Sequence, residues 1–177
     1  MILPVTRLGH PILRKKAVLV RPGDILRPQT QELIDSMFET MVKYEGIGLA
    51  ANQVGQSLRI CVFGLTLPGS QAPAASQTRV LINPRVTAVG RGKKAGWEGC
   101  LSVPGLRARV NRFRRVRVKA LNRAGKKIEF TATGLPAVVI QHEADHLQGL
   151  VFLDRVTDRK SLSFPEEYQK FHAKKRR

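Results

Sequence analysis

The clearest hydrophobic pattern in the chain is a stripe of apolar residues at helical spacing that starts near Thr30. The stripe consists of Leu33, Ile34, Met37, Phe38, Met41 and Val42, and the opposite side carries Glu32, Asp35, Glu39 and Lys43. Apolar residues three or four positions apart lie on one side of a helix and can face a core. We therefore predict an amphipathic helix that ends near Gly46, because glycine favours helix termination.

Four apolar or alternating runs predict strands, at residues 60–65, 80–82, 115–120 and 127–131. In the third run, valine and alanine alternate with arginine and lysine, which is typical of a half-buried strand with a basic outer face. The second run is expected to stop at Asn83, because Pro84 cannot donate a hydrogen bond to a neighbouring strand. The sequence Asn-Arg-Ala-Gly at 122–125 predicts a turn between the last two strands.

Two more helices are expected in the second half of the chain. One can begin at Pro136 and run to His146 or Leu147, with Gly149 as its stop. The other can follow Pro165. A length of 177 residues with 42% apolar residues favours one domain over 1–177 with a real core.

The helix expected to begin at Pro136 carries the sequence His142-Glu143-Ala144-Asp145-His146, an HExxH pattern. Histidines four positions apart face the same way on a helix, so both imidazoles can reach one metal ion. Glu143 is offset by one position and need not be a ligand. It can instead reach a water molecule at the open coordination position. Asp145 could support a ligand or could be a surface charge, and the sequence leaves both readings open.

The third metal ligand has two candidate positions in the sequence. A downstream glutamate, Glu166 or Glu167, would make the chain a zinc metallopeptidase of the HExxH type. An upstream cysteine, Cys100, would supply a thiolate, which is a strong ligand for zinc or ferrous iron. The other cysteine, Cys61, lies in an apolar run and is expected to be a buried core residue.

Three segments of the chain resemble the motifs of the peptide deformylase family, in order and with plausible spacing. They are the Gly-Ile-Gly-Leu-Ala-Ala-Asn-Gln sequence at 46–53, the Glu-Gly-Cys-Leu-Ser sequence at 98–102 and the Gln-His-Glu-Ala-Asp-His sequence at 141–146. The resemblance implies a mixed α+β fold in which antiparallel sheets surround a central helix that carries the HExxH pattern. It also implies a hydrolase that removes the formyl group from the N-terminal formylmethionine of newly made polypeptides.

The same resemblance assigns roles to individual residues. Cys100, His142 and His146 would bind the metal ion, and Glu143 would act as general base and then as general acid. The side-chain amide of Gln53 and the backbone N–H of Leu101 would stabilise the oxyanion. The family is associated with ferrous iron, so Fe(II) is the expected metal, although zinc, nickel or cobalt can occupy such a ligand set.

Substrate binding is expected at residues next to these motifs. Ile47, Val138 and Val139 are candidates for an apolar pocket that receives the methionine side chain. Gly48 lacks a side chain, which would allow a substrate strand to pair with its backbone. Arg107 resembles a position near the substrate backbone.

The net charge of +18 is large for a small domain and predicts attraction to polyanions such as RNA. Residues 107–127 carry ten lysines and arginines and no acidic residue, and residues 174–177 form a basic C-terminal tail. A nucleic-acid-binding protein without catalysis is one reading of this charge. A second is an enzyme that docks on ribosomes, where formylated chains emerge, and a third is a solvated basic face that binds no partner. We expect no membrane span and no targeting segment, and hence a cytoplasmic protein.

Overall fold

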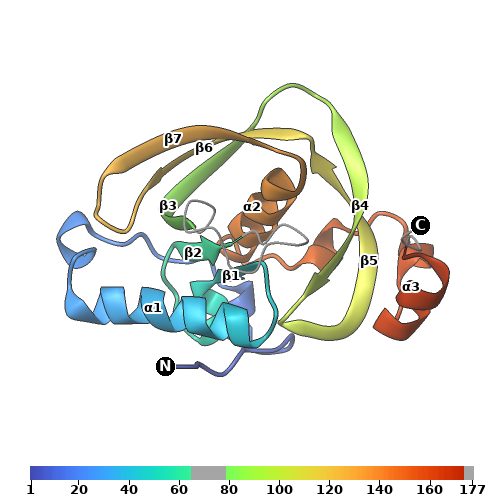
Figure 1. Ribbon diagram of the computed structural model, residues 1–177, viewed down its shortest axis with the longest axis horizontal. Helices are drawn as coiled ribbons and strands as arrows, with labels where there is room; N and C mark the ends of the chain where they lie inside the picture. The colour runs from blue at the N-terminus through green and yellow to red at the C-terminus, as the bar shows by residue number, and fades with distance from the viewer. Residues whose placement is uncertain (65–78, 174–177) are drawn as a thin grey trace, which may run out of the picture.

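Two antiparallel sheets flank the helix that carries the two motif histidines (Figure 1). The structure is a computed structural model that describes residues 1–64 and 79–173. The larger sheet has the strand order β1-β2-β3-β6-β7 and consists of β1 (Gly48–Ala50), β2 (Ile60–Phe63), β3 (Arg79–Ala88), β6 (Arg115–Leu121) and β7 (Lys127–Thr133). The smaller sheet pairs β4 (Lys93–Cys100) with β5 (Val103–Phe113). The α+β class predicted from the sequence is confirmed.

Three α-helices accompany the sheets among the described residues: α1 (Pro28–Lys43), α2 (Gly134–His146) and α3 (Pro165–Phe171). All three lie where the sequence predicted helices. Short 3-10 helices connect the elements at Pro11–Arg14, Pro22–Asp24, Ala51–Val54, Phe152–Arg155 and Arg159–Ser161. None of the helices in the described part of the chain is long and apolar enough to cross a membrane.

Helix α2 lies between the two sheets, and its buried residues explain this place. Ala137, Val139 and Ile140 pack with Val118 of β6 and other side chains of the larger sheet in one apolar cluster. A second cluster joins α1 to β1 and β2, and it contains Ile34, Met37, Leu49, Ile60 and Val62 among others. Cys61 is buried in the first cluster, as expected.

The end of α2 depends on Gly149, the glycine that the sequence marked as a stop. Its φ of +79° lies in the left-handed region, and its N–H donates to the His146 carbonyl. A β-carbon at this position would lie 2.5 Å from the backbone oxygen of Arg14. Only glycine therefore allows the chain to turn here and to pass against the N-terminal segment.

The prediction that a strand stops at Asn83 is wrong, because β3 continues to Ala88. The register between β3 and β6 shifts between Ile82 and Arg85, which marks a bulge. Pro84 occupies this bulge, where no ladder hydrogen bond is required of it. Asn83 adopts a φ of +53°, and its side-chain amide bonds to both backbone polar groups of Val20.

The sequence did not predict β1, β4 or β5. Much of β4 is lysine, glycine and small residues, which have low strand propensity, and its pairing with β5 supplies the order that composition does not. The basic stripe at 107–127 divides between β5, β6, the turn that follows and the first residue of β7. Its Arg112 is buried and Arg107 is half-buried, whereas the other eight basic residues are exposed. The basic tail at 174–177 and the polar residues 68–78 lie outside the described residues.

Candidate metal centre and catalytic pocket

Three side chains with metal-binding atoms meet where β4 ends against α2. Cys100 is the last residue of β4, and His142 and His146 lie one turn apart on α2. One ligand atom from each lies within 4.8 Å of the other two, and the Cys100 Sγ is 3.2 Å from the His146 Nε2. Among residues 1–64 and 79–173 this is the one such group of histidine, cysteine or acidic side chains. Glu166 and Glu167 are exposed on α3 and do not belong to it.

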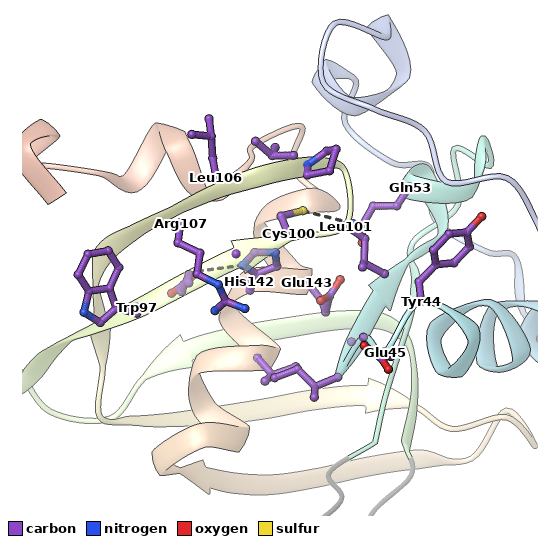
Figure 2. Close-up of a pocket in the computed structure, with 18 of the residues that line it drawn as sticks. Tyr44, Glu45, Gln53, Trp97, Cys100, Leu101, Leu106, Arg107, His142 and Glu143 are labelled. Atoms are coloured by element: carbon purple, nitrogen blue, oxygen red, sulfur yellow. Dashed lines mark hydrogen bonds and ion pairs between the residues drawn. The ribbon is translucent and has the colours of Figure 1, made fainter. Parts of the chain in front are cut away.

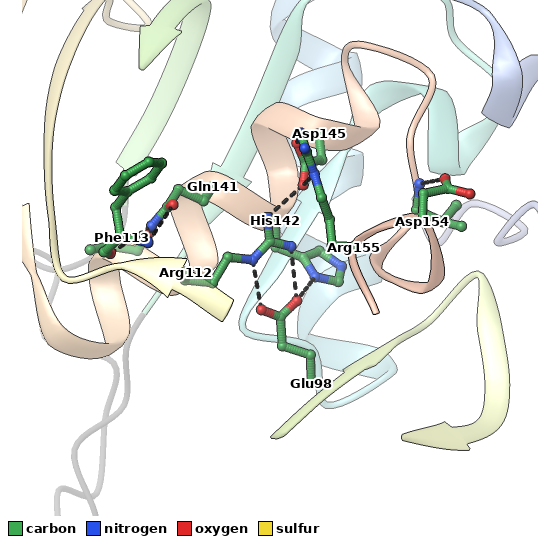
Figure 3. Close-up of polar contacts among 10 residues, drawn as sticks. Glu98, Arg112, Phe113, Gln141, His142, Asp145, Asp154 and Arg155 are labelled. Carbon is green, nitrogen blue, oxygen red and sulfur yellow. Dashed lines mark hydrogen bonds and ion pairs between the residues drawn. The ribbon is translucent and has the colours of Figure 1, made fainter. Parts of the chain in front are cut away.

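His142 is oriented by a carboxylate that the sequence reading gave no role. Glu98 of β4 is 94% buried, and its Oε2 lies 2.8 Å from the His142 Nδ1 (Figure 3). Burial alone would raise the pKa of Glu98, but hydrogen bonds from His142 and Arg112 outweigh it and lower this pKa to about 2. A carboxylate on Nδ1 leaves Nε2 as the nitrogen that can bind a metal ion.

The same network extends to Asp145, which the sequence allowed to be either a support for a ligand or a surface charge. Arg112 is buried and donates to both Glu98 oxygens, at 2.7 and 3.0 Å, and also to Asp145. Asp145 is buried as well and accepts a second arginine, Arg155, at 2.6 Å. Asp145 is therefore a supporting group behind the two histidines and not a solvated surface charge.

His146 is held from its backbone, and its ring is fully buried. Asn52, in the 3-10 helix after β1, donates its side-chain amide to the His146 carbonyl at 2.6 Å. Burial, and then the charge of His142, lower the pKa of His146 well below its usual value. A neutral imidazole offers a lone pair, which is the form that binds metal ions.

The centre favours a positive charge, which fits a bound cation. Burial would lower the pKa of His142, but hydrogen bonds that its ring donates to Cys100 and Glu98 outweigh it and raise this pKa to about 10. The Cys100 sulfur and the Glu98 carboxylate thus favour a positive charge at this point of the pocket. One cysteine and two histidines form a donor set suited to zinc or ferrous iron, with room for a further ligand.

Glu143 lies beside the ligand cluster with its carboxylate out of water. The residue is 96% buried, and its Oε2 has no hydrogen-bond partner among the described residues. Burial raises its pKa to about 7. Gly48 of β1 allows this placement, because a β-carbon at position 48 would lie 2.5 Å from the Glu143 Oε1. The absent side chain at Gly48 therefore makes room for Glu143, a reason that the sequence reading had not given.

Gln53 points its amide nitrogen at the centre. Its Nε2 lies 3.4 Å from the Cys100 Sγ and 3.1 Å from the Ser102 Oγ, while its Oε1 accepts from the Ala50 backbone at 2.9 Å. These contacts fix which end of the amide faces the metal ligands. Leu101 follows Cys100 in the turn between β4 and β5, so its backbone lies next to the same point.

A pocket of about 450 Å³ opens onto this centre (Figure 2). Every residue that the sequence reading assigned to the site lines it except His146, which lies buried beneath. The lining includes Ile47, Gly48, Gln53, Cys100, Leu101, Arg107, Val138, Val139, His142 and Glu143. Trp97 and Arg107 lie at one end of the pocket, and Tyr44 and Glu45 lie at the other. The pocket thus brings the buried Glu143 carboxylate, two of the three candidate ligands and an apolar wall together.

Comparison with known proteins shows the family of this chain. The family model for polypeptide deformylase matches residues 2–162. The chain belongs to the polypeptide deformylase family. It is similar to peptide deformylase 1 of Prochlorococcus marinus, with 43% identity over 168 residues that cover 93% of this chain and 86% of the relative. It is also similar to the peptide deformylase of Aquifex aeolicus, with 42% identity and 96% of each chain covered.

A solved peptide deformylase has the same fold. The Acinetobacter baumannii enzyme bound to Met-Ala-Ser matches with a TM-score of 0.81 and 34% identity, over 88% of this chain and 99% of that one. The deformylase family comprises metal-dependent hydrolases that remove the formyl group from N-formylmethionine peptides, and this chain is a hydrolase of that family. The sequence reading missed the supporting residues Glu98, Arg112 and Asn52. Glu98 and Asn52 stood inside the quoted motifs, but nothing in the sequence revealed their partners.

Proposed function

We propose that this deformylase uses one divalent metal ion held by Cys100, His142 and His146 to hydrolyse the formamide of formylmethionine. The observation that carries the proposal is the cluster of three ligand atoms within 4.8 Å beside the buried, unpartnered Oε2 of Glu143. Water adds to the formyl carbon, the carbon–nitrogen bond breaks, and the nitrogen takes up a proton. Formate and a free N-terminal amine are the products.

The metal ion would supply Lewis acidity and lower the pKa of a water molecule from about 15.7 toward about 7. We propose Fe(II), on the family resemblance; the cysteine and two histidines also suit zinc, nickel or cobalt. The Glu98 carboxylate occupies the Nδ1 of His142 and so would leave its Nε2 to bind this ion.

We assign proton transfer to Glu143. Its carboxylate takes a proton as water adds to the formyl carbon and returns it to the departing nitrogen. A pKa raised to about 7 by burial suits both steps near neutral pH. The close approach of β1 at Gly48 leaves the carboxylate little freedom to turn away from the pocket.

We assign oxyanion stabilisation to the Gln53 side-chain amide and the Leu101 backbone N–H. When the formyl carbon becomes tetrahedral, its oxygen gains negative charge, and one well-placed donor lowers the barrier by roughly 3 kcal/mol. The Ala50 backbone and the Ser102 hydroxyl hold the Gln53 amide before substrate arrives, so little reorganisation is needed.

We assign the methionine side chain to the apolar wall of Ile47, Val138 and Val139. All three line the pocket, and Ile47 is 45% exposed, so a ligand could cover it. The backbone of Gly48 and the side chain of Arg107 would contact the main chain of the substrate. A peptide that begins with methionine, Met-Ala-Ser, is bound in the related Acinetobacter baumannii structure.

We further propose that the enzyme works in the cytoplasm on nascent chains and docks on ribosomal RNA through its basic surface. The eight exposed basic residues within 107–127 support this, together with the net charge of +18. Binding through phosphate contacts weakens steeply as salt rises. Co-sedimentation with ribosomes should therefore occur at low salt and disappear at high salt. No binding at low salt would end this part of the proposal.

The enzymatic proposal is tested by anaerobic purification, metal analysis and an assay of formate release from formyl-Met peptides. We expect formate release from iron-loaded protein and its loss, with loss of metal, in Cys100→Ser. The rival peptidase reading predicts the reverse, with metal retained in Cys100→Ser and lost in Glu166→Ala. No formate from iron-loaded wild-type protein would overturn the proposal.

A further inference from the structure

Helix α3 is attached to the rim of the catalytic pocket, although it supplies none of the residues proposed for catalysis. Just before the helix, Ser163 and Arg107 exchange two backbone hydrogen bonds, of 2.8 and 2.9 Å. Two residues earlier, the Ser161 hydroxyl accepts from the Arg109 backbone at 3.0 Å. The segment that leads into α3 therefore adds a short third row of backbone pairing to β5.

An aromatic residue of α3 lies over the side of the β4–β5 sheet that carries Trp97 and Arg107. In this sheet Trp97 pairs with Arg109, and Gly99 pairs with Arg107, so these four residues share one side. The Tyr168 ring of α3 is 5.0 Å from the Trp97 ring. The Arg107 Cζ lies 5.0 Å from the centre of the same Tyr168 ring. Tyr168 thus contacts Trp97 and the guanidinium of Arg107 at once.

These contacts orient the Arg107 side chain and leave the N–H groups of its guanidinium available to donate hydrogen bonds. Its side chain crosses Gly99, where a β-carbon would meet the Arg107 Cγ at 3.5 Å and Cζ at 3.7 Å. Its guanidinium forms no hydrogen bond or ion pair with residues 1–64 or 79–173. Arg107 lines the pocket at the end where Trp97 lies (Figure 2). A guanidinium with free donors at a pocket rim can bind the carbonyl oxygens of an extended peptide.

We propose that Tyr168, backed by Trp97, positions Arg107 over the pocket and so makes α3 part of the site that binds the substrate beyond its first residue. The inference rests on the proposed function and adds a positioning residue to it. A cation held on an aromatic face loses less freedom when it binds a ligand than a solvated arginine does. Tighter binding is therefore expected only for substrates long enough to reach Arg107.

The test compares formylmethionine amide with the amide of formyl-Met-Ala-Ser, since neither carries a free carboxylate. In Tyr168→Leu we expect the KM of the three-residue substrate to rise about three- to tenfold, with kcat unchanged within about twofold. The one-residue substrate should keep both constants. Tyr168→Phe retains the ring and should behave as wild type. Phe171→Leu, which changes an exposed aromatic residue of the same helix, is the matched control.

A double-variant cycle distinguishes positioning through Arg107 from a general loosening of α3. If Tyr168 acts through Arg107, Tyr168→Leu adds no further rise in KM to that of Arg107→Leu. Additive effects, equal changes for both substrates or no change for the longer one would overturn the inference. If Tyr168→Leu fails to fold, Trp97→Leu removes the other ring of the contact and must show the same selective rise. Turnover of the one-residue substrate tests the proposed function separately.

Discussion

The Glu98 Oε2 lies 2.8 Å from the His142 Nδ1, and this contact connects the metal centre to a buried network of charge. Arg112 fixes Glu98 from the other side with two hydrogen bonds. We expect Glu98→Gln to weaken metal affinity about 10- to 100-fold, because the carboxylate orients the imidazole and increases its basicity. Competition against a chelator measures this affinity. Glu129→Gln, at an exposed glutamate of β7, should leave it unchanged.

Replacing Glu143 by glutamine should lower the activity of the enzyme and raise the stability of the metal-free protein. We expect Glu143→Gln to lower kcat at least about 100-fold while the metal content stays the same, because the amide cannot accept the proton. At pH 8, above the Glu143 pKa of about 7, the metal-free variant should unfold at a higher temperature than metal-free wild type, because a neutral amide avoids the cost of burying a negative charge. Loss of metal in this variant would instead make Glu143 a ligand, contrary to the assignment.

Gly48 offers a test of how closely β1 positions Glu143. In Gly48→Ala the new methyl group would lie 2.5 Å from the Glu143 Oε1 and 2.9 Å from a Val139 methyl carbon, so the carboxylate must move. A displacement of about 1 Å can lower catalysis about 100-fold. We expect a loss of that order in kcat/KM with unchanged metal content. Gly96→Ala, with no atom within 4 Å of the new methyl group, should retain full activity.

The two cysteines should differ in their reaction with a thiol reagent. Burial raises the pKa of the Cys61 thiol, which keeps it protonated and inaccessible in the folded protein. Cys100 is half-buried and should react once a chelator has removed the metal. We expect no reactive thiol in metal-loaded protein, one in metal-free protein and two after unfolding. A reactive thiol in fully loaded native protein would contradict ligation by Cys100.

A bidentate contact between α1 and the β6–β7 turn predicts a small acid sensitivity. Hydrogen bonds from Arg123, of 2.6 and 2.8 Å, lower the pKa of Asp35 below its usual 3.8. A lowered pKa in the folded state means that the stabilisation is present above pH 3.8 and lost as pH falls through the folded value. Because both side chains are about half exposed, the contribution is roughly 0.5 kcal/mol.

Urea unfolding of wild type and Asp35→Asn measures this contribution. The variant should be less stable at pH 7, and the difference should shrink toward pH 2 as Asp35 of the wild type takes up a proton. A difference that persists unchanged at the lower pH would show that lost packing, and not lost charge, causes it.

Much of the candidate site could be predicted from the sequence, because two of its candidate metal ligands follow a local rule. Two histidines four positions apart on a helix must share a side, and the resemblance supplied Cys100 and Gln53. The network of Glu98, Arg112, Asp145 and Arg155 could not be predicted, because it joins β4, β5, α2 and a 3-10 helix. Which charges meet across such distances depends on strand register, and no pattern in the sequence indicates that β4 pairs with β5.

In the fold, too, the elements with local sequence features could be predicted, and those that depend on tertiary structure could not. Helix α1 was predicted from its apolar periodicity, and α2 from Pro136 near its start and Gly149 after its end, all of which are local features. β3 was ended too early at Pro84, since a bulge that removes proline from the hydrogen-bond ladder depends on tertiary structure. The strand β1 has three residues and is defined by its partner β2, not by its own composition.

X-ray absorption spectroscopy at the metal edge is the most direct test of the central claim, because it counts ligand types around the bound ion. With Cys100, His142 and His146 as ligands, the loaded protein should show one sulfur and two imidazole nitrogens per metal. The sulfur contribution should vanish in Cys100→Ser. A shell of nitrogen and oxygen without sulfur in the wild-type protein would contradict the account and direct attention to a carboxylate ligand such as Glu166.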